Sequence, residues 1–495
     1  MKFISTRGGE CVTGARAIAQ GIAADGGLFV PESFPAVSSA ELETMLSMNY
    51  AERAAFVLHK YLDEYDYDAL KGACEKAYAQ FEGGDAAPLV KIDQGLYILE
   101  LFHGPTCAFK DMALTLLPYL LRTGCDLCGV KEQVLILVAT SGDTGKAALE
   151  GFKDAPGIKI MVFYPNDGVS KMQKLQMSTQ EGENVNVVAV RSNFDDCQTA
   201  VKTIFTGEQY KKELLEKGYI LSSANSINFG RLAPQIAYYF SAYLDLVSSD
   251  QIELGEPVHF AVPTGNFGNI LAAYYAKRMG LPVGKLLCAS NKNNILTDFI
   301  HTGVYDKRRE FYKTMSPSMD ILISSNLERL LFEICGRDAG RVSDLMRQLK
   351  EEGAYSLGEE EKAAVQELFY GDFCGEDETV ETIYEFFEEY QYPMDTHTAC
   401  AMYATDTYRA RHEKDKAPVV VVSTASPYKF PQDVMYAITG NDIKDSFKAI
   451  KHLNIATAMQ VPKNLSKLRD KPVRFTAVAD KDKLYPEVLK FIDRK

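Results

Sequence analysis

Lys110 combines the residue type and the surroundings of a reactive amine. A strand-like run at residues 97–102 leads into His-Gly-Pro-Thr at 103–106, a turn sequence because Gly frees the backbone and Pro fixes it. Lys110 then lies between Phe109 and an apolar segment, residues 112–117, that is predicted to be a buried helix. Desolvation there lowers the pKa of a lysine and exposes the free amine that attacks carbonyl carbons and forms Schiff bases.

The same lysine has a simpler interpretation. Most lysines are solvated, and the neighbouring Asp111 is an obvious salt-bridge partner that would explain the position without chemistry. Lys110 alone therefore does not decide between a catalytic and a structural role, and a ligand that needs the amine has to be sought elsewhere in the chain.

Two glycine-rich turns each follow an apolar run and open a helical pattern. Residues 140–145 (TSGDTG) follow the run 133–139, and residues 263–269 (PTGNFGN) follow the run 257–262. Free N–H groups and the helix dipole make such a turn a phosphate cradle, although neither matches GxxxxGK[ST] or GxGxxG. The alternative is a plain strand-to-helix turn capped by Asn or Ser. Together with a Schiff-base lysine, a phosphate cradle indicates pyridoxal 5'-phosphate, whose aldehyde needs the amine and whose phosphate needs the cradle.

Short apolar runs alternate with helical patterns from Gly95 onward. The runs span residues 133–139, 158–163, 185–190, 218–222, 257–262, 285–289 and 418–423, with a last strand expected at 473–479. Continuous apolar strands separated by helices are typical of a parallel sheet covered on both faces, and ligands bind such sheets at the carboxyl ends of the strands. The polar turns 223–228 and 424–427 follow two further runs and belong to the same expected edge.

The pattern predicts an α/β protein with two parallel-sheet α/β domains and a helical N-terminal domain. We expect a mainly helical domain at residues 1–92, with helices between 38 and 82, and an α/β domain at 93–235 that carries the cofactor lysine. A second α/β domain at 236–495 would carry the phosphate loop and a helical insertion at 324–415.

Composition narrows the class of protein. The 495 residues include 46% hydrophobic and 24% charged residues, as in an ordinary globular protein, and the net charge of −13 argues against a nucleic-acid partner. No apolar stretch approaches the ~18 residues of a membrane span, and no signal peptide is evident at the start, so the expected location is the cytoplasm. Ten scattered cysteines fit reduced thiols, and the single pair Cys125 and Cys128 predicts no metal site.

Six blocks in chain order carry a resemblance to a known family. They read ISTRG, ADGGLFVPE, HGPTCAFKD, ATSGDTG, PTGNFGN and SSNLERLLFE, and with the turn at 424–427 they extend from residue 4 to about 430. The chain resembles threonine synthases, which are fold-type II pyridoxal-phosphate enzymes. The resemblance implies conversion of O-phospho-L-homoserine and water to L-threonine and phosphate.

The resemblance also implies residue roles. Lys110 matches the lysine that carries the cofactor, and Thr424 matches the hydroxyl that hydrogen-bonds the pyridine nitrogen. The residues that match the cofactor-phosphate loop are Gly265, Asn266, Phe267 and Asn269; those expected at the substrate carboxylate are Thr140, Ser141, Gly142, Asp143 and Thr144. One departure is Ser426, where the family block has histidine. A hydroxyl at the ring nitrogen cannot hold a pyridinium as a carboxylate would, which favours elimination and replacement over transamination.

The substrate's own phosphate needs a second cationic site. Arg7, Lys146 and Arg329 are the candidates, because guanidinium and ammonium groups recognise phosphate. The possible neutral donors are Ser141, Ser324, Ser325 and Asn326. Arg329 could equally pair with Glu328 or Glu333 on a helix surface.

Two alternative functions remain open at this stage. A fold-type II amino-acid dehydratase would share Lys110 and the phosphate loop but need no second anion site. A non-catalytic cofactor-binding or metabolite-sensing protein could use the same scaffold. In each case the partner is a small molecule, and the expected assembly is a monomer or homodimer.

Overall fold

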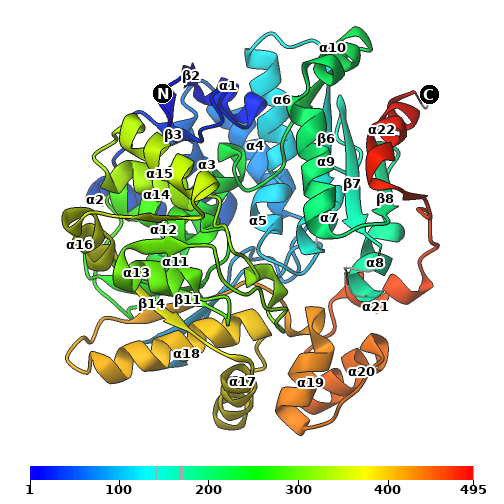
Figure 1. Ribbon diagram of the computed structural model, residues 1–495. Helices are drawn as coiled ribbons and strands as arrows, with labels where there is room; N and C mark the ends of the chain where they lie inside the picture. Colours follow the sequence, from blue (N-terminus) through cyan, green and yellow to red (C-terminus); the bar gives the residue numbers. More distant parts are fainter. Residues whose placement is uncertain (141, 167–168, 170, 494–495) are drawn as a thin grey trace.

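The computed structural model describes the chain except residues 141, 167–168, 170 and 494–495. Residues 1–82 form a small antiparallel sheet, in the order β2-β1-β3, with helices packed beside it (Figure 1). Its elements are β1 (Lys2–Ser5), β2 (Cys11–Thr13), α1 (Gly14–Gln20), β3 (Phe29–Pro31), α2 (Ser39–Met45), α3 (Tyr50–Tyr61) and α4 (Tyr67–Tyr78). The helices expected between 38 and 82 are present, and Ser38 and Asn49 begin α2 and α3 with capping boxes.

The larger of the two main sheets has six strands in the order β14-β11-β10-β15-β5-β4, parallel except for the antiparallel edge strand β4. Its strands are β4 (Leu89–Asp93), β5 (Leu96–Glu100), β10 (Val258–Pro263), β11 (Val283–Ser290), β14 (Phe369–Phe373) and β15 (Val419–Ser423). The helices that accompany it are α11 (Phe229–Ser248), α12 (Gly268–Arg278), α13 (Ile295–Thr302) and α18 (Thr396–Arg411). The strands are apolar and mostly buried, as expected for a sheet covered on both faces.

The smaller parallel sheet has the order β16-β8-β7-β6-β9. It contains β6 (Gln133–Ala139), β7 (Ile158–Pro165), β8 (Val185–Val190), β9 (Tyr219–Ser222) and β16 (Val478–Ala479), with α7 (Asp143–Gly151), α8 (Lys171–Ser178), α9 (Phe194–Thr206), α10 (Glu208–Glu216) and the C-terminal α22 (Leu484–Ile492) around it. Figure 1 shows α22 beside β8, far in sequence but near in space. The strand expected at 473–479 is present only as its last two residues.

The remaining elements surround these sheets. They are α5 (Asp111–Leu114), α6 (Leu117–Leu127), β12 (Val304–Asp306), η1 (Pro317–Met319), α14 (Leu327–Ile334), α15 (Ala339–Glu351), β13 (Ala354–Ser356), α16 (Glu359–Leu368), α17 (Glu376–Tyr390), η2 (Pro427–Lys429), α19 (Pro431–Thr439), α20 (Ser446–Thr457), α21 (Lys463–Ser466), η3 (Leu468–Asp470) and η4 (Lys481–Lys483). The apolar segment 112–117 is interrupted between α5 and α6, and Pro118 lies in the first turn of α6, where its missing N–H costs nothing.

The sheets cross the domain boundaries expected at residues 92 and 235. β5, the strand before Lys110, pairs in parallel with β15 of the larger sheet, and β16 pairs with β8 of the smaller one. The expected insertion 324–415 likewise contains β14, an edge strand of the larger sheet. Parallel neighbours are joined by crossovers of variable length, so an apolar run shows that a strand exists without showing its partner. Lys110 therefore follows a strand of the same sheet as the loop 264–269, which the sequence predicts to bind a phosphate.

Candidate active site

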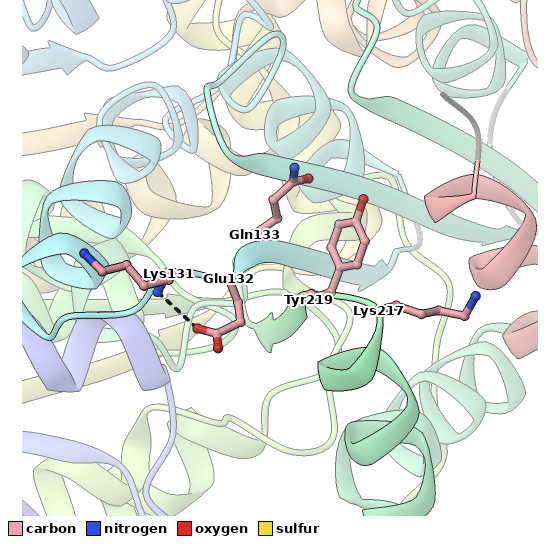
Figure 2. A pocket seen from close by; sticks show the side chains of 6 residues that line it. Lys131, Glu132, Gln133, Lys217 and Tyr219 are labelled. Atoms are coloured by element: carbon pink, nitrogen blue, oxygen red, sulfur yellow. Dashed lines mark hydrogen bonds between the residues drawn. The ribbon is translucent and has the colours of Figure 1, made fainter.

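The open pocket in Figure 2 lies away from the ligand-binding edge of the sheet. Lys131, Gln133, Lys217 and Tyr219 line it at the amino ends of β6 and β9. Ligands of parallel sheets bind at the carboxyl ends. We therefore place the functional site at the opposite edge, where the turns singled out in the sequence lie.

Three neighbouring strands of the larger sheet bring the expected cofactor residues together. β10, β15 and β5 are adjacent and parallel, and they are followed by the loop 264–269, by Thr424 and by the turn to Lys110. The Phe109 N–H donates to the Thr424 carbonyl oxygen at 2.8 Å, so the residue next to Lys110 is bonded directly to the end of β15. One edge of one sheet thus holds all three features.

Lys110 is partly buried, with an aromatic ring on one side and polar and charged side chains near its amine. Its Nζ is 4.9 Å from the centroid of the Phe109 ring and 3.4 Å from the Ser318 hydroxyl. Burial lowers the pKa of Lys110, and the positive charges of Arg231 and Lys429 lower it further, against the opposing effect of Asp143. The lysine is therefore biased toward the free amine, as the sequence predicts.

Asp111 is not the salt-bridge partner that its position beside Lys110 implied. Its carboxyl group accepts hydrogen bonds from the Thr106 N–H at 2.7 Å and the Thr106 hydroxyl at 2.6 Å, within the turn before the lysine. Burial raises the pKa of Asp111 to about 6, although the Thr106 bonds oppose the change. Asp111 closes the turn, and Lys110 is left free to point elsewhere.

This raised pKa predicts a pH-dependent stability. A carboxyl whose pKa is higher in the folded state stabilises that state below its unfolded value, near 4, and loses the contribution as pH rises through 6. The free energy of unfolding, relative to Asp111→Asn, should therefore fall between pH 4 and 6, by up to about 3 kcal/mol. Urea titrations of both proteins across this range measure the difference, and parallel pH profiles would contradict the assignment.

The loop after β10 is tightly packed and leaves an unpaired buried donor at the start of α12. Phe267 has a positive φ of 62°, and a Cβ on Gly265 would stand 2.8 Å from the Ser318 carbonyl oxygen. The Asn269 Oδ1 accepts hydrogen bonds from the hydroxyls of Tyr238 and Tyr239, which orients the amide. Its Nδ2 is buried and lacks a hydrogen-bond partner in the described part of the chain. An orphaned donor beside a helix N-terminus fits a cofactor phosphate.

Asn326 binds this loop directly, and Arg329 fixes Asn326. The Asn326 Nδ2 donates to the Asn266 carbonyl at 3.0 Å, and the Ser324 hydroxyl donates to the Gly265 carbonyl at 2.7 Å. Arg329, fully buried, donates to the carbonyls of Phe29, at 3.0 Å, and Ile227 and to the Asn326 Oδ1. Both residues, expected at the substrate, have protein partners that fix the loop.

Removal of the Arg329 guanidinium should therefore lower the stability of the folded protein. Arg329→Met leaves three buried acceptors without donors, so we expect the free energy of unfolding to fall by about 3 kcal/mol or more. Urea denaturation of the variant measures the change. Arg347→Met, which removes an exposed arginine of α15, is the control and should stay within about 0.5 kcal/mol of wild type. Equal stability of the Arg329 variant and wild type would contradict the assigned role.

The other two expected substrate-phosphate cations are also paired within the protein. Arg7 donates from Nε and Nη2 to the two oxygens of Glu328, at 3.0 and 2.9 Å. The Lys146 Nζ contacts the Glu150 carboxylate at 2.7 Å and the Gln180 amide oxygen. Neither charge is available for a phosphate without breaking an ion pair. Ser325, a possible donor, has its hydroxyl 3.4 Å from the Asn266 side-chain oxygen.

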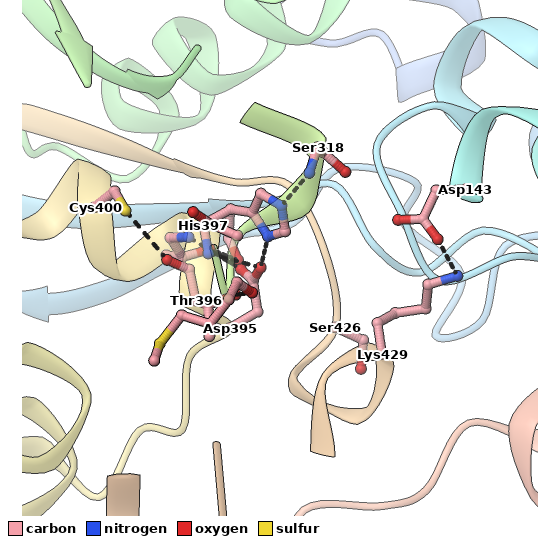
Figure 3. Close-up of polar contacts among 12 residues, drawn as sticks. Asp143, Ser318, Asp395, Thr396, His397, Cys400, Ser426 and Lys429 are labelled. Carbon is pink, nitrogen blue, oxygen red and sulfur yellow. Dashed lines mark hydrogen bonds and ion pairs between the residues drawn. The ribbon is translucent and has the colours of Figure 1, made fainter. Parts of the chain in front are cut away.

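The turn after β6 faces the larger sheet through a buried ion pair. The Thr140 hydroxyl accepts hydrogen bonds from the N–H groups of Gly142 and Gly145, both at 3.0 Å, and closes the turn; Ser141 lies outside the described residues. Asp143 and Thr144 form the first turn of α7, and the Asp143 carboxylate is 3.1 Å from the Lys429 Nζ (Figure 3). Burial raises the pKa of Asp143, but Lys429 and Lys110 outweigh it and hold the pKa below its usual value.

Thr424 and Ser426 follow β15 and are both buried. The Ser426 hydroxyl accepts a hydrogen bond from the Tyr428 N–H at 3.3 Å and so caps the turn η2, which carries Lys429. In place of the family's imidazole, this chain therefore has a capping hydroxyl, and Thr424 stays beside the residue before Lys110.

His397, a buried histidine near Lys110, was not singled out from the sequence. The Ser318 N–H donates to His397 Nε2 at 3.1 Å, and His397 Nδ1 lies 2.6 Å from the Asp395 carboxylate (Figure 3). Because Nε2 accepts, the ring proton lies on Nδ1 and is held by Asp395, the N-cap of α18. The pair thus fixes Ser318, whose hydroxyl contacts Lys110. Asp-x-His before a helical pattern signals a cap, but nothing in the sequence links it to residue 318.

No group of three or more metal-ligating side chains is found among the described residues, and Cys125 and Cys128 at the end of α6 are free thiols. None of the described helices is long and apolar enough to cross a membrane.

A lysine at the carboxyl edge of a parallel sheet, next to a loop with an unpaired buried donor at a helix N-terminus, is the arrangement expected of the fold-type II pyridoxal-phosphate class. Comparison with known families agrees. The model described as "Pyridoxal-phosphate dependent enzyme" matches residues 85–366, and the models "Threonine synthase N terminus" and "Threonine synthase, C-terminal" match residues 2–78 and 398–491. The chain belongs to the threonine synthase family.

Relatives and solved structures support the assignment over most of the chain. Threonine synthase of Pseudomonas aeruginosa is 39% identical over 89% of this chain and 91% of its own length. Pyridoxal-phosphate-bound threonine synthase from Brucella melitensis superposes with a TM-score of 0.89, at 36% identity over the whole of both chains. Human "Threonine synthase-like 1" is 43% identical over 87% of this chain but 59% of its own length, so the chain spans about three-fifths of the first curated relatives.

Proposed function

We propose that the protein converts O-phospho-L-homoserine and water to L-threonine and phosphate with pyridoxal 5'-phosphate as cofactor. The observation that carries the proposal is the convergence of Lys110, the loop 265–269 and Thr424 at the ends of three adjacent strands. These residues fit the cofactor. The unpaired Asn269 Nδ2 and the N-terminus of α12 can bind its phosphate, and the buried Lys110 amine can bind its aldehyde. A Cβ at Gly265 would clash with the Ser318 carbonyl oxygen, so only glycine allows the loop to keep this backbone position.

The chain's own residues then have distinct roles. When bound, the cofactor supplies an electron sink for the amino acid attached to it. Lys110 would take and return protons at Cα and Cβ, and the lowering of its pKa by burial makes the amine a more available base. The Thr424 hydroxyl would face the ring nitrogen of the cofactor; a neutral donor there would not hold a pyridinium, which would limit transamination. The N–H groups of Asp143 and Thr144, in the first turn of α7, would bind the substrate carboxylate.

Product analysis separates this function from its alternatives. Purified protein given O-phospho-L-homoserine should release phosphate and form threonine in equal amounts. Ammonia and oxoacid from serine or threonine, without phosphate release from phosphohomoserine, would instead identify a dehydratase. Cofactor binding without turnover of any of the three amino acids would identify a binding or sensing protein. Location in the cytoplasm and assembly as a monomer or homodimer stay predictions from the sequence.

A further inference from the structure

Ser318, in the turn η1, contacts three different parts of the chain with its three polar groups. Its hydroxyl accepts a hydrogen bond from the Lys110 Nζ at 3.4 Å, the only hydrogen bond of that amine among the described residues. Its carbonyl oxygen is the atom that a Cβ at Gly265 would meet at 2.8 Å. Its N–H donates to the His397 Nε2 at 3.1 Å (Figure 3). The position of this one residue therefore affects the lysine and the loop 265–269 together.

The Lys110 amine needs a partner to stay in one orientation. Fixing a lysine side chain costs up to about 2 kcal/mol of rotamer freedom. The Phe109 ring lies 4.9 Å from Nζ, but it sets no direction for the N–H bonds. The Ser318 oxygen does set one, because it accepts along an N–H bond. A distance of 3.4 Å is long for such a bond, and catalytic hydrogen bonds commonly shorten when the reactant is bound.

His397 is a neutral acceptor held by Asp395. The ring is 2% exposed, and its Nδ1 lies 2.6 Å from the carboxylate of Asp395, which is fully buried. That carboxylate also accepts the Thr398 N–H at 3.1 Å as the N-cap of α18, so it cannot move without uncapping the helix. With the ring proton on Nδ1, Nε2 keeps the lone pair that accepts the Ser318 N–H. The first turn of α18 thus holds Ser318 through two buried side chains.

The same turn of α18 contacts two other segments of the site. The Thr396 hydroxyl donates to the Met315 carbonyl at 2.7 Å, just before η1. The Thr398 hydroxyl lies 2.9 Å from the hydroxyl of Ser423, the last residue of β15. Because β15 is bonded through Thr398 and not through the imidazole, a change at His397 should act on η1 and leave the end of β15 in place.

We propose that Ser318 is a catalytic residue that orients the Lys110 amine, and that His397 is a positioning residue that acts through Ser318. The proposal rests on the proposed function for the reaction that Lys110 serves, but the attack of Lys110 on the cofactor aldehyde tests it without any substrate. In that attack the Lys110 Nζ bonds to the aldehyde carbon, and both amine protons leave with the aldehyde oxygen as water. An amine that rotates freely takes the productive direction less often.

The first test uses Ser318→Ala. Capture of pyridoxal phosphate by the apoprotein is followed by stopped flow as the change in absorbance of the cofactor. The variant should capture cofactor about fivefold more slowly than wild type, the effect expected of one hydrogen bond. Its kcat for threonine formation should fall by a similar factor. KM and the equilibrium affinity for cofactor should change less than about threefold, because the carbonyl that faces Gly265 is kept.

The second test asks whether His397 acts through Ser318. His397→Leu should slow capture to the same extent as Ser318→Ala, and the variant with both changes should be no slower than either one, because both changes remove the same interaction. His397→Gln should restore part of the rate, since its amide oxygen can accept the Ser318 N–H. A histidine that only supports the fold would instead slow capture independently of residue 318.

His259 offers a matched control at the opposite end of the larger sheet, near the start of β10. It is 5% exposed, its Nδ1 accepts the Lys285 N–H at 2.7 Å, and its Nε2 lies 2.9 Å from the Asp415 carboxylate. This is the same arrangement as at His397, away from Lys110. His259→Leu should therefore lower the stability as His397→Leu does, but capture cofactor at the wild-type rate.

The outcomes separate the parts of the proposal. Equal capture rates in Ser318→Ala and wild type would overturn the role given to Ser318. If the effects of Ser318→Ala and His397→Leu multiply in the double variant, the positioning role of His397 is wrong. Should His397→Leu fail to fold, Ser318→Ala combined with His397→Gln gives the same comparison. A protein whose capture rate depends on both residues but that makes no threonine would reject the proposed function and leave this inference standing.

Discussion

Lys110→Ala should reduce threonine formation by about a thousandfold or more, because the cofactor-binding amine and the proton carrier are lost together. Cofactor should still bind through the loop at the start of α12, because Lys110 is not part of that loop. Phosphate release and the absorbance of the bound cofactor measure the two effects separately. Lys91→Ala, at an exposed lysine of β4, is the control and should match wild type in both. Turnover of Lys110→Ala within tenfold of wild type would contradict the role given to the lysine.

Gly265→Val should weaken cofactor affinity by about a hundredfold or more. Any Cβ at this position stands 2.8 Å from the Ser318 carbonyl oxygen, so the loop or the turn η1 has to move, and the cradle moves with it. At Gly268 the nearest atom to such a Cβ is the Asn326 amide nitrogen at 3.5 Å, an ordinary contact within the protein.

The two glycines therefore give an internal comparison. Titration of the apoproteins with cofactor should rank Gly265→Val as the weaker binder and Gly268→Val as intermediate. Gly72→Ala in α4, where nothing lies within 4 Å of the added Cβ, should equal wild type. Wild-type affinity in Gly265→Val would show that the loop is only a turn.

Local sequence predicted where strands and helices lie, but not which strands pair with each other. The run 133–139 matches β6 at both ends, because β-branched and aliphatic residues are bounded there by turn-forming ones. The pairing of β5 with β15, more than 300 residues apart in sequence, depends on packing of the whole sheet and has no local signal. The boundary expected at residue 235 also falls inside α11, whose residues are nearly all buried between other elements.

The site shows the same division. Lys110, the loop 265–269 and the turn that begins at Thr424 were singled out because each follows an apolar run, and these runs are neighbouring strands of one sheet. The role given to Thr424 came from the family resemblance and stays a prediction. Lys429 and His397 were missed, because their partners lie on other elements and meet them only in the folded chain. Arg7 was selected by residue type alone, and its partner Glu328 is more than 300 positions away.

The central claim, that the cofactor is carried by Lys110, is tested most directly by reduction and peptide mapping. Borohydride treatment of the yellow holoprotein should fix one cofactor per chain, and proteolysis should place it on the peptide that contains Lys110. Labelling of Lys110→Ala under the same conditions should fall to background. Recovery of the label on another lysine of the site, such as Lys429, would contradict the account.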